Sequence, residues 1–107
     1  MLISELPWIT RMNGGWVYIV TNRPDGTLYI GVTSDLPRRI WEHREGVYQG
    51  FTKRYRLNRL VWCERFEDIR DAIAHEKKMK EWRRAWKVKL ILAANPEWRD
   101  LYEDLNL

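Results

Sequence analysis

Two short runs of β-branched and aromatic residues mark the start of regular structure in this chain. They span 16–21 and 27–33 and are separated by a five-residue segment that contains Pro24 and Gly26. Because proline and glycine favour tight turns, the pattern predicts a β-hairpin, and its short connection makes the two strands antiparallel. A third run at 60–66 predicts another strand.

A helix is predicted after the hairpin. Ser34 or Asp35 can accept hydrogen bonds from the free amides of a following helix, and Pro37 suits its first turn, where a missing N–H costs little. We expect this helix to run to about Arg44 and to end near the glycine that follows. Residues 47–57 show no clear period, so we expect a loop there.

Two further helices are expected after the third strand. Asp68 can cap the first of them, whose apolar positions form one stripe: Ile69, Ala72, Ile73 and Met79. The next helix repeats large apolar residues at a spacing of four, and we expect both of its tryptophans in the core: Trp82, Trp86 and Leu90, followed by Ile91. Asn95 and Pro96 end this helix and suit the start of a final short one, with Asn95 as its cap.

The element order is therefore β-β-α-β-α-α-α, an α+β arrangement in which helices cover a small sheet. The 107 residues are the length of one domain, with a core at about 15–96 and an acidic C-terminal helix at 97–107. The sign of the net charge changes at the same boundary: residues 1–96 carry +7, and the segment from Glu97 onward carries −3. A positive body of this kind favours a polyanionic partner.

Composition excludes several classes of protein. Hydrophobic residues make up 45% and charged residues 32%, the balance of a folded domain rather than a disordered chain. Cys63 is the only cysteine, which excludes a disulfide scaffold and a zinc–cysteine site. No apolar run approaches the ~18 residues of a membrane span, so we expect a cytoplasmic protein without a membrane partner.

Glu76 is a carboxylate in an unexpected place. It lies seven residues after Ile69 and three after Ile73, on the helix stripe that should face the core. Burying an unpaired carboxylate is costly, so Glu76 either pairs with a nearby arginine or binds a hard cation. Helix position alone favours the ion pair, because ion pairs outnumber metal sites.

Arg39 and His43 lie four residues apart and project from one side of the first helix. They have the chemistry of a phosphate site, but two polar residues at this spacing more often form a solvated helix face. Tyr18 and Tyr29 lie in the hairpin strands, where packing is the default role of an aromatic residue. A catalytic tyrosine would need a cation beside it, because a phenol with a pKa near ~10 is a poor base.

Two basic runs are candidates for nucleic-acid contact. The first surrounds an aromatic residue in the expected loop and consists of Lys53, Arg54, Tyr55, Arg56 and Arg59. The second, from Lys77 to Lys89, has seven basic residues and one acid. Basic side chains bind phosphates and an aromatic can stack on a base, but solvated helix faces have the same composition.

Several of these residues occur together in an order that resembles the GIY-YIG nuclease superfamily. The strands contain Val17-Tyr18-Ile19 and Tyr29-Ile30-Gly31, followed by the segment 33–43. The match continues through four dipeptides, namely Phe51-Thr52, Leu60-Val61, Glu76-Lys77 and Asn95-Pro96. It covers nearly the whole chain and is nearest to the small stand-alone bacterial members. The resemblance implies a three-stranded antiparallel sheet flanked by helices and metal-dependent hydrolysis of nucleic-acid phosphodiesters.

The resemblance also implies roles for individual residues. Tyr18 matches the tyrosine usually assigned as general base, and Tyr29 matches the tyrosine that orients the attacking water. Arg39 matches the arginine that stabilises the phosphate, and His43 matches a position that assists proton transfer. Glu76 matches the sole protein ligand of the metal, Mg²⁺ or Mn²⁺.

Further positions match or depart from the family pattern. Gly31 is the glycine of the second motif, and Asn95 matches a late asparagine that braces the site. Trp16 and Val17 replace the glycine and isoleucine of the first motif. Val32 stands where some members have a lysine that helps to activate the base.

These observations together predict a metal-dependent endonuclease. We expect DNA as its substrate, with single-stranded or flapped DNA preferred because the chain lacks a recognition helix for a groove. Lys53, Arg54, Tyr55, Arg56 and Lys77 are the expected nucleic-acid contacts. The alternatives are a catalytically silent nucleic-acid-binding module on the same scaffold and a protein-interaction adaptor. The oligomeric state cannot be read from the sequence.

Overall fold

The structure is a computed structural model and describes residues 14–47 and 50–105. Three strands, four α-helices and one 3₁₀-helix occur in the described part of the chain. They are β1 (Gly15–Thr21), β2 (Leu28–Thr33), α2 (Leu36–Arg44), α3 (Phe51–Arg54), β3 (Arg59–Phe66), α4 (Ile69–Lys80), α5 (Arg84–Ala94) and η2 (Tyr102–Leu105). The predicted α+β fold with a three-stranded antiparallel sheet is confirmed.

The sheet has the order β2-β1-β3, so β1 is the central strand and pairs antiparallel with both neighbours. Its pairing with β3 contains a bulge, because Ile19 lies opposite Trp62 whereas Val20 lies opposite Leu60. Val61 is therefore the additional residue on β3. A bulge bends a strand locally and increases its twist.

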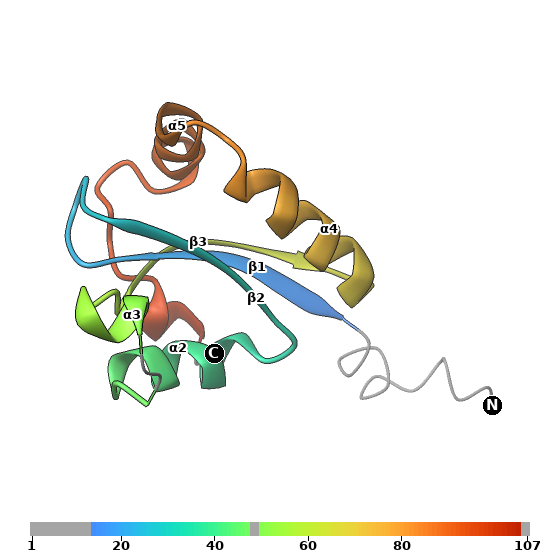
Figure 1. The fold of residues 1–107 in the computed structure, drawn as a ribbon, viewed down its shortest axis with the longest axis horizontal. Coiled ribbons are helices and arrows are strands. Elements are labelled where there is room, and N and C mark those ends of the chain that lie inside the picture. Colours follow the sequence, from blue (N-terminus) through green and yellow to red (C-terminus); the bar gives the residue numbers. More distant parts are fainter. Residues whose placement is uncertain (1–13, 48–49, 106–107) are drawn as a thin grey trace.

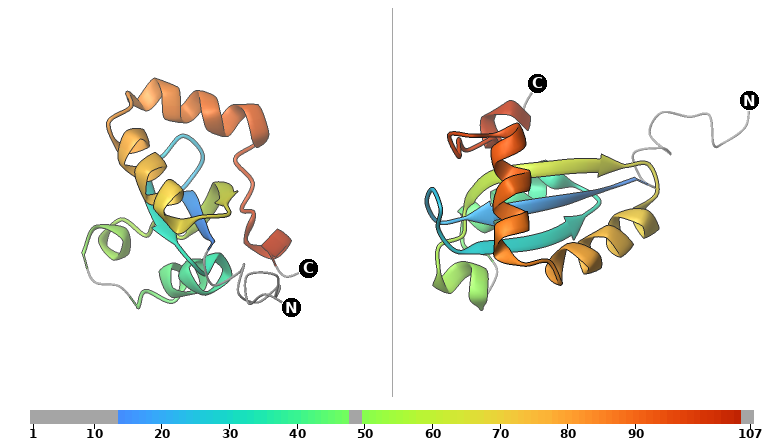
Figure 2. Two further views of the ribbon diagram at one scale, coloured as in Figure 1. Left: turned by 90° about the vertical axis from the view of Figure 1, so that its right-hand side faces the viewer. Right: turned by 90° about the horizontal axis from the view of Figure 1, so that it is seen from above.

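Side chains that alternate along β1 divide the core into two layers. Val17 and Ile19 belong to a cluster on the side of α4 and α5, whereas Tyr18 and Val20 belong to a second cluster. In the second cluster the buried partners include residues of α2 such as Ile40. Figure 1 shows the sheet between α4 and α5 on one face and α2 and α3 on the other. The first view of Figure 2 shows the same layers from the side.

The predicted caps of two helices are confirmed. The Asp35 carboxylate accepts a hydrogen bond from the Arg38 backbone N–H at 3.3 Å, and a proline lies in the first turn of α2. The Asp68 carboxylate caps α4 by accepting from the Arg70 backbone N–H at 2.9 Å. Hydrogen bonds from the Arg70 side chain and backbone lower the pKa of Asp68 to about 2.

The segment expected to be a loop contains a short helix. α3 occupies Phe51–Arg54, and the expected loop also includes residues 48 and 49, which lie outside the described part. A helix of four residues makes about one turn, so no hydrophobic period can reveal it. Leu57, which is 1% exposed, follows α3 and joins the second core cluster.

Two predicted core residues lie at the surface. Ile73 is 38% exposed and Trp86 is 56% exposed. The buried face of α4 is narrower than its apolar stripe, because only Ala72 and Met79 are fully buried. In α5, only Ile91 is fully buried. Trp82 is half-buried against the first core cluster, as the sequence predicts.

The prediction of a helix that starts at Asn95 and Pro96 is wrong. Residues 96–101 are not helical, η2 covers Tyr102–Leu105, and residues 106 and 107 of the expected helix lie outside the described part. The Asn95 side chain does not cap a helix but joins two other segments. Its amide nitrogen donates to the carbonyl oxygens of Arg99 at 2.8 Å and Val61 at 3.2 Å, and its oxygen accepts from the Arg99 N–H at 3.0 Å.

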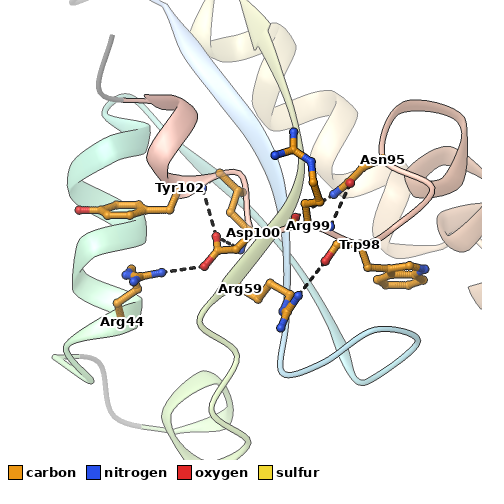
Figure 3. A network of polar contacts seen from close by, with 8 residues as sticks. Arg44, Arg59, Asn95, Trp98, Arg99, Asp100 and Tyr102 are labelled. Carbon is orange, nitrogen blue, oxygen red and sulfur yellow. Dashed lines mark hydrogen bonds and ion pairs between the residues drawn. The ribbon is translucent and has the colours of Figure 1, made fainter.

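Asp100 fastens the C-terminal segment to α2 and β3 (Figure 3). Its carboxylate accepts hydrogen bonds from the Arg44 guanidinium at 2.7 Å, the Leu60 backbone N–H at 3.2 Å and the Tyr102 backbone N–H at 3.1 Å. Arg59 donates to the Trp98 carbonyl oxygen at 2.9 Å nearby. Side-chain contacts of this kind replace the regular hydrogen bonds that a helix would supply.

Candidate active site

A buried tyrosine and a histidine meet at the centre of the sheet face that α2 covers. Tyr18 is 1% exposed on β1, and its hydroxyl oxygen lies 2.9 Å from Nε2 of His43 on α2. Their ring centroids are 5.7 Å apart in an edge arrangement. Leu36 and Ile40, both fully buried, seat α2 on the sheet and so hold His43 against the phenol.

Gly31 gives Tyr18 the space that its ring occupies. The two residues are direct partners in the pairing of β1 with β2. A Cβ atom at position 31 would lie 2.8 Å from Cε1 of Tyr18 and closer still to its Cζ and hydroxyl oxygen. The glycine is therefore required here by the close approach of a side chain and not by a turn.

Tyr29 lies near the same histidine. It projects from β2, and its ring centroid is 6.1 Å from that of His43, again in an edge arrangement. His43 thus contacts both tyrosines that the sequence predicts as site residues. Tyr29 is half-buried and packs against the second core cluster.

The surroundings of His43 favour its neutral form. Burial lowers the pKa of His43 below its usual value, and the charge of Arg39 lowers it further, while Glu42 partly opposes both effects. A neutral imidazole has one nitrogen that can accept a proton. With Nε2 at hydrogen-bonding distance, that nitrogen can accept from the Tyr18 hydroxyl group.

Arg39 lies one turn before His43 on α2. It is half-buried, and its Nε is 3.6 Å from a carboxylate oxygen of Glu42. The spacing of three residues places both side chains on one side of the helix. A half-buried guanidinium on the helix that carries His43 can neutralise an anion that approaches the Tyr18–His43 pair.

Glu76 is paired, and its partner is a lysine rather than an arginine. Its side chain is 12% exposed, and Lys80 Nζ lies 3.3 Å from Oε1. The same ammonium nitrogen is 5.8 Å from the centroid of the Tyr29 ring. Lys80 therefore connects α4 with Tyr29. It is not among the residues predicted from the sequence, although a glutamate followed by a lysine four residues later is a recognised helix pair.

The predicted nucleic-acid contacts of the first basic run form an exposed group beside the end of α2. Lys53, Arg54, Tyr55 and Arg56 are all exposed on α3 and the turn after it. The Arg54 guanidinium lies 5.6 Å from the centroid of the Tyr55 ring. Lys77 is exposed on α4. Their contact with phosphates stays a prediction.

Comparison with known proteins decides which family this site belongs to. Residues 14–89 match the sequence profile of the GIY-YIG catalytic domain. The chain belongs to the GIY-YIG family. Tyr18, Gly31, Arg39, His43 and Glu76 all lie within the matched range. The family is one of nucleases, and nucleic acids are its substrates.

Individual proteins resemble this chain over most of its length. A UPF0213 protein of Staphylococcus saprophyticus is 36% identical over 80 residues, which are 75% of this chain and 96% of the relative. A UPF0213 protein of Pediococcus pentosaceus is 32% identical over 87 residues, or 81% of this chain and 87% of the relative. The solution NMR structure of the UPF0213 protein BH0048 from Bacillus halodurans has a TM-score of 0.51 and 27% identity, and covers 81% of this chain and 92% of that one.

GIY-YIG nucleases generally depend on a divalent metal. Within residues 14–47 and 50–105, no group of three or more histidine, cysteine or acidic residues is arranged to hold a metal ion. That result is incompatible with a site built from many protein ligands. It is compatible with Mg²⁺, which keeps several waters and needs only one or two carboxylates. Glu76, mostly buried and carrying a hard oxygen donor, fits that role.

Two departures from the GIY-YIG motifs have packing roles in this chain. Trp16 packs against the second core cluster, and Val32 packs against the first. Val32 therefore contributes to the hydrophobic layer under α4 and α5 in place of the lysine found in some members. Lys80 places an ammonium group near Tyr29 from a different element.

Asn95 lies in a different hydrogen-bond network from the candidate site. Its hydrogen bonds reach the bulge residue Val61 and the C-terminal segment, and they do not reach the Tyr18–His43 pair. β3 in turn pairs with β1, where Cys63 lies opposite Tyr18.

In the described part of the chain, no helix has the length and apolar character needed to cross a membrane.

Proposed function

We propose that this protein is a metal-dependent endonuclease that hydrolyses phosphodiester bonds in DNA, with single-stranded or flapped DNA preferred. The observation that carries the proposal is the 2.9 Å contact between the buried Tyr18 hydroxyl group and His43 in a member of a nuclease family. The contact satisfies two polar groups that burial would otherwise leave without a hydrogen-bond partner, and it also places a proton acceptor directly beside the phenol.

The Tyr18–His43 pair supplies the proton chemistry. A phenol by itself is a poor base near neutral pH. In this site Nε2 of the neutral His43 accepts the hydroxyl proton of Tyr18 while the Tyr18 oxygen takes a proton from the attacking water. The water oxygen bonds to phosphorus as the bond between phosphorus and the leaving oxygen breaks, and the protonated His43 then donates its proton to that leaving oxygen. Tyr29, whose ring also lies near His43, orients that water. The lowered pKa of His43 keeps its acceptor nitrogen available at neutral pH.

Charge on the phosphate is balanced by the cationic side chains. Arg39 stabilises the negative charge that develops on the phosphoryl oxygens. The exposed Lys53, Arg54, Arg56 and Lys77 hold the neighbouring phosphates, and Tyr55 offers a surface for a base. Glu76 would hold Mg²⁺ or Mn²⁺, which when bound polarises the phosphoryl group.

The test is a cleavage assay with Mg²⁺, Mn²⁺ or EDTA on single-stranded, duplex and flapped DNA and on RNA. Wild-type protein is compared with Glu76→Gln and Arg39→Ala, and Glu67→Gln serves as the control because it removes an exposed acid just before α4. We expect metal-dependent product from wild type and the control, none from Glu76→Gln, and a turnover about 10²-fold lower for Arg39→Ala.

Each outcome has a definite meaning. Equal cleavage by Glu76→Gln and wild type would refute the metal assignment. Salt-sensitive binding without product on any substrate would favour the catalytically silent binding module, in which Trp16 and Val32 mark the loss of activity. Absence of nucleic-acid binding at low salt would leave a protein-interaction role.

A further inference from the structure

A basic surface with an exposed tryptophan lies on α5 and the end of α4. We call it the Trp86 patch and define it by five residues: Lys80, Arg83, Trp86, Lys87 and Lys89. Trp86 is 56% exposed. α5 itself contains three basic side chains and no acidic one. The path of α4 into α5 across the sheet is visible in the second view of Figure 2.

Packing within the domain does not explain why a tryptophan stands at position 86. Its only ring contact in the described part of the chain is with Trp82, at 6.3 Å between centroids and 69° between planes. That edge contact steadies the indole from one side and leaves more than half of the residue accessible. α5 is anchored instead by Ile91, which is fully buried.

Contacts connect the Trp86 patch to the candidate active site. Lys80 Nζ pairs with Glu76 at 3.3 Å and lies 5.8 Å from the centre of the Tyr29 ring. Lys87 Nζ in turn donates to the backbone oxygen of Lys80 at 3.4 Å. Trp86 precedes Lys87 in the chain, so Lys80 and Lys87, joined by that hydrogen bond, lie between Tyr29 and the exposed indole.

The chemistry of this surface selects its partner. Ammonium and guanidinium groups attract phosphates, and an accessible indole stacks on the flat face of a base. In a duplex the faces of the bases are covered by neighbouring bases. A duplex could therefore bind the basic side chains through its phosphates, but it has no free base face for Trp86. A strand with unpaired bases can make both the phosphate contacts and the stacking contact.

We propose that the Trp86 patch binds a single-stranded segment of nucleic acid, with one unpaired base stacked on Trp86 and the adjoining phosphates on its lysine and arginine side chains. This inference rests on the proposed function for the class of polymer and adds a second contact surface outside the catalytic residues. It requires that the substrate carry an unpaired stretch beside the bond that is cut.

The experiment measures the affinity of the whole protein, in EDTA, for two labelled strands by fluorescence anisotropy. One is a short single-stranded DNA, and the other has the same length and phosphate charge but consists of abasic sites. The variants are Trp86→Ala and Trp86→Phe. Leu92→Ala is the matched control, because Leu92 is exposed on the same helix but lies about 120° around it from Trp86. Circular dichroism confirms that each variant is folded.

We expect Trp86→Ala to weaken binding of the DNA strand about 10-fold and to leave binding of the abasic strand unchanged. Trp86→Phe retains most of the affinity because it keeps a stacking face, and Leu92→Ala binds as wild type does. Equal affinity of Trp86→Ala and wild type for the DNA strand would overturn the inference. So would an equal loss on both strands, or no binding of either strand by wild type.

The cleavage assay separates this inference from the proposed function. Metal-dependent cleavage with unchanged affinity in Trp86→Ala would support the proposed nuclease activity and refute binding at the Trp86 patch. Base-dependent binding through Trp86 without cleavage would support the patch and refute the nuclease.

Discussion

Replacing Gly31 with alanine tests whether Tyr18 is held in place by the close approach of two strands. The added Cβ would lie 2.8 Å from Cε1 of Tyr18 and closer to two other atoms of the same side chain. Tyr18 is 1% exposed, so its ring has no free space into which to move. Overpacking of this kind typically costs about 1–3 kcal/mol, which for a domain of this size lowers the melting temperature by about 5–20 °C.

The assay is thermal unfolding combined with the cleavage assay, and a second background makes the test specific. Tyr18→Leu removes the two ring carbons and the hydroxyl oxygen that the new Cβ would meet. In that background Gly31→Ala should be neutral or stabilising by about 0.5 kcal/mol, since alanine is preferred to glycine within a strand. A Gly31→Ala protein with unchanged melting temperature, or an equal loss in both backgrounds, would refute the packing argument.

Two other predictions concern the bonds that hold the C-terminal segment and the site. Asn95→Ala removes three hydrogen bonds of a buried side chain and leaves the Val61 carbonyl oxygen without that partner, so we expect the melting temperature to fall by about 10 °C, at a cost of about 2 kcal/mol. For His43 the folded-state pKa lies below the unfolded value, so the unfolded chain binds more protons as the pH falls below about 6.5. Wild-type stability should therefore decline as the pH is lowered from that value, and urea titrations of His43→Gln should show a shallower decline; identical profiles would contradict the assigned direction.

Local sequence patterns determined much of this fold. The hairpin turn, the caps Asp35 and Asp68, and the three strands were predictable because each depends on residues close together in the chain. The motif order also pointed to Tyr18, Tyr29, Arg39 and Glu76 before any contact was known. The partner of Glu76 was within reach of the same reasoning, since Lys80 follows it by one helical turn.

Tertiary structure alone decided which of these side chains meet and which remain exposed. Tyr18 and His43 are 25 residues apart, and their contact depends on how α2 seats on the sheet. Trp86 has the periodic spacing of a core residue but lies at the surface, because α5 buries only a narrow face, of which Ile91 is the one fully buried residue. Asn95 has the sequence signature of a helix cap, yet its amide is used by β3 and Arg99. Periodicity and capping act over a few residues, whereas these outcomes depend on partners that only the packed layers bring within reach.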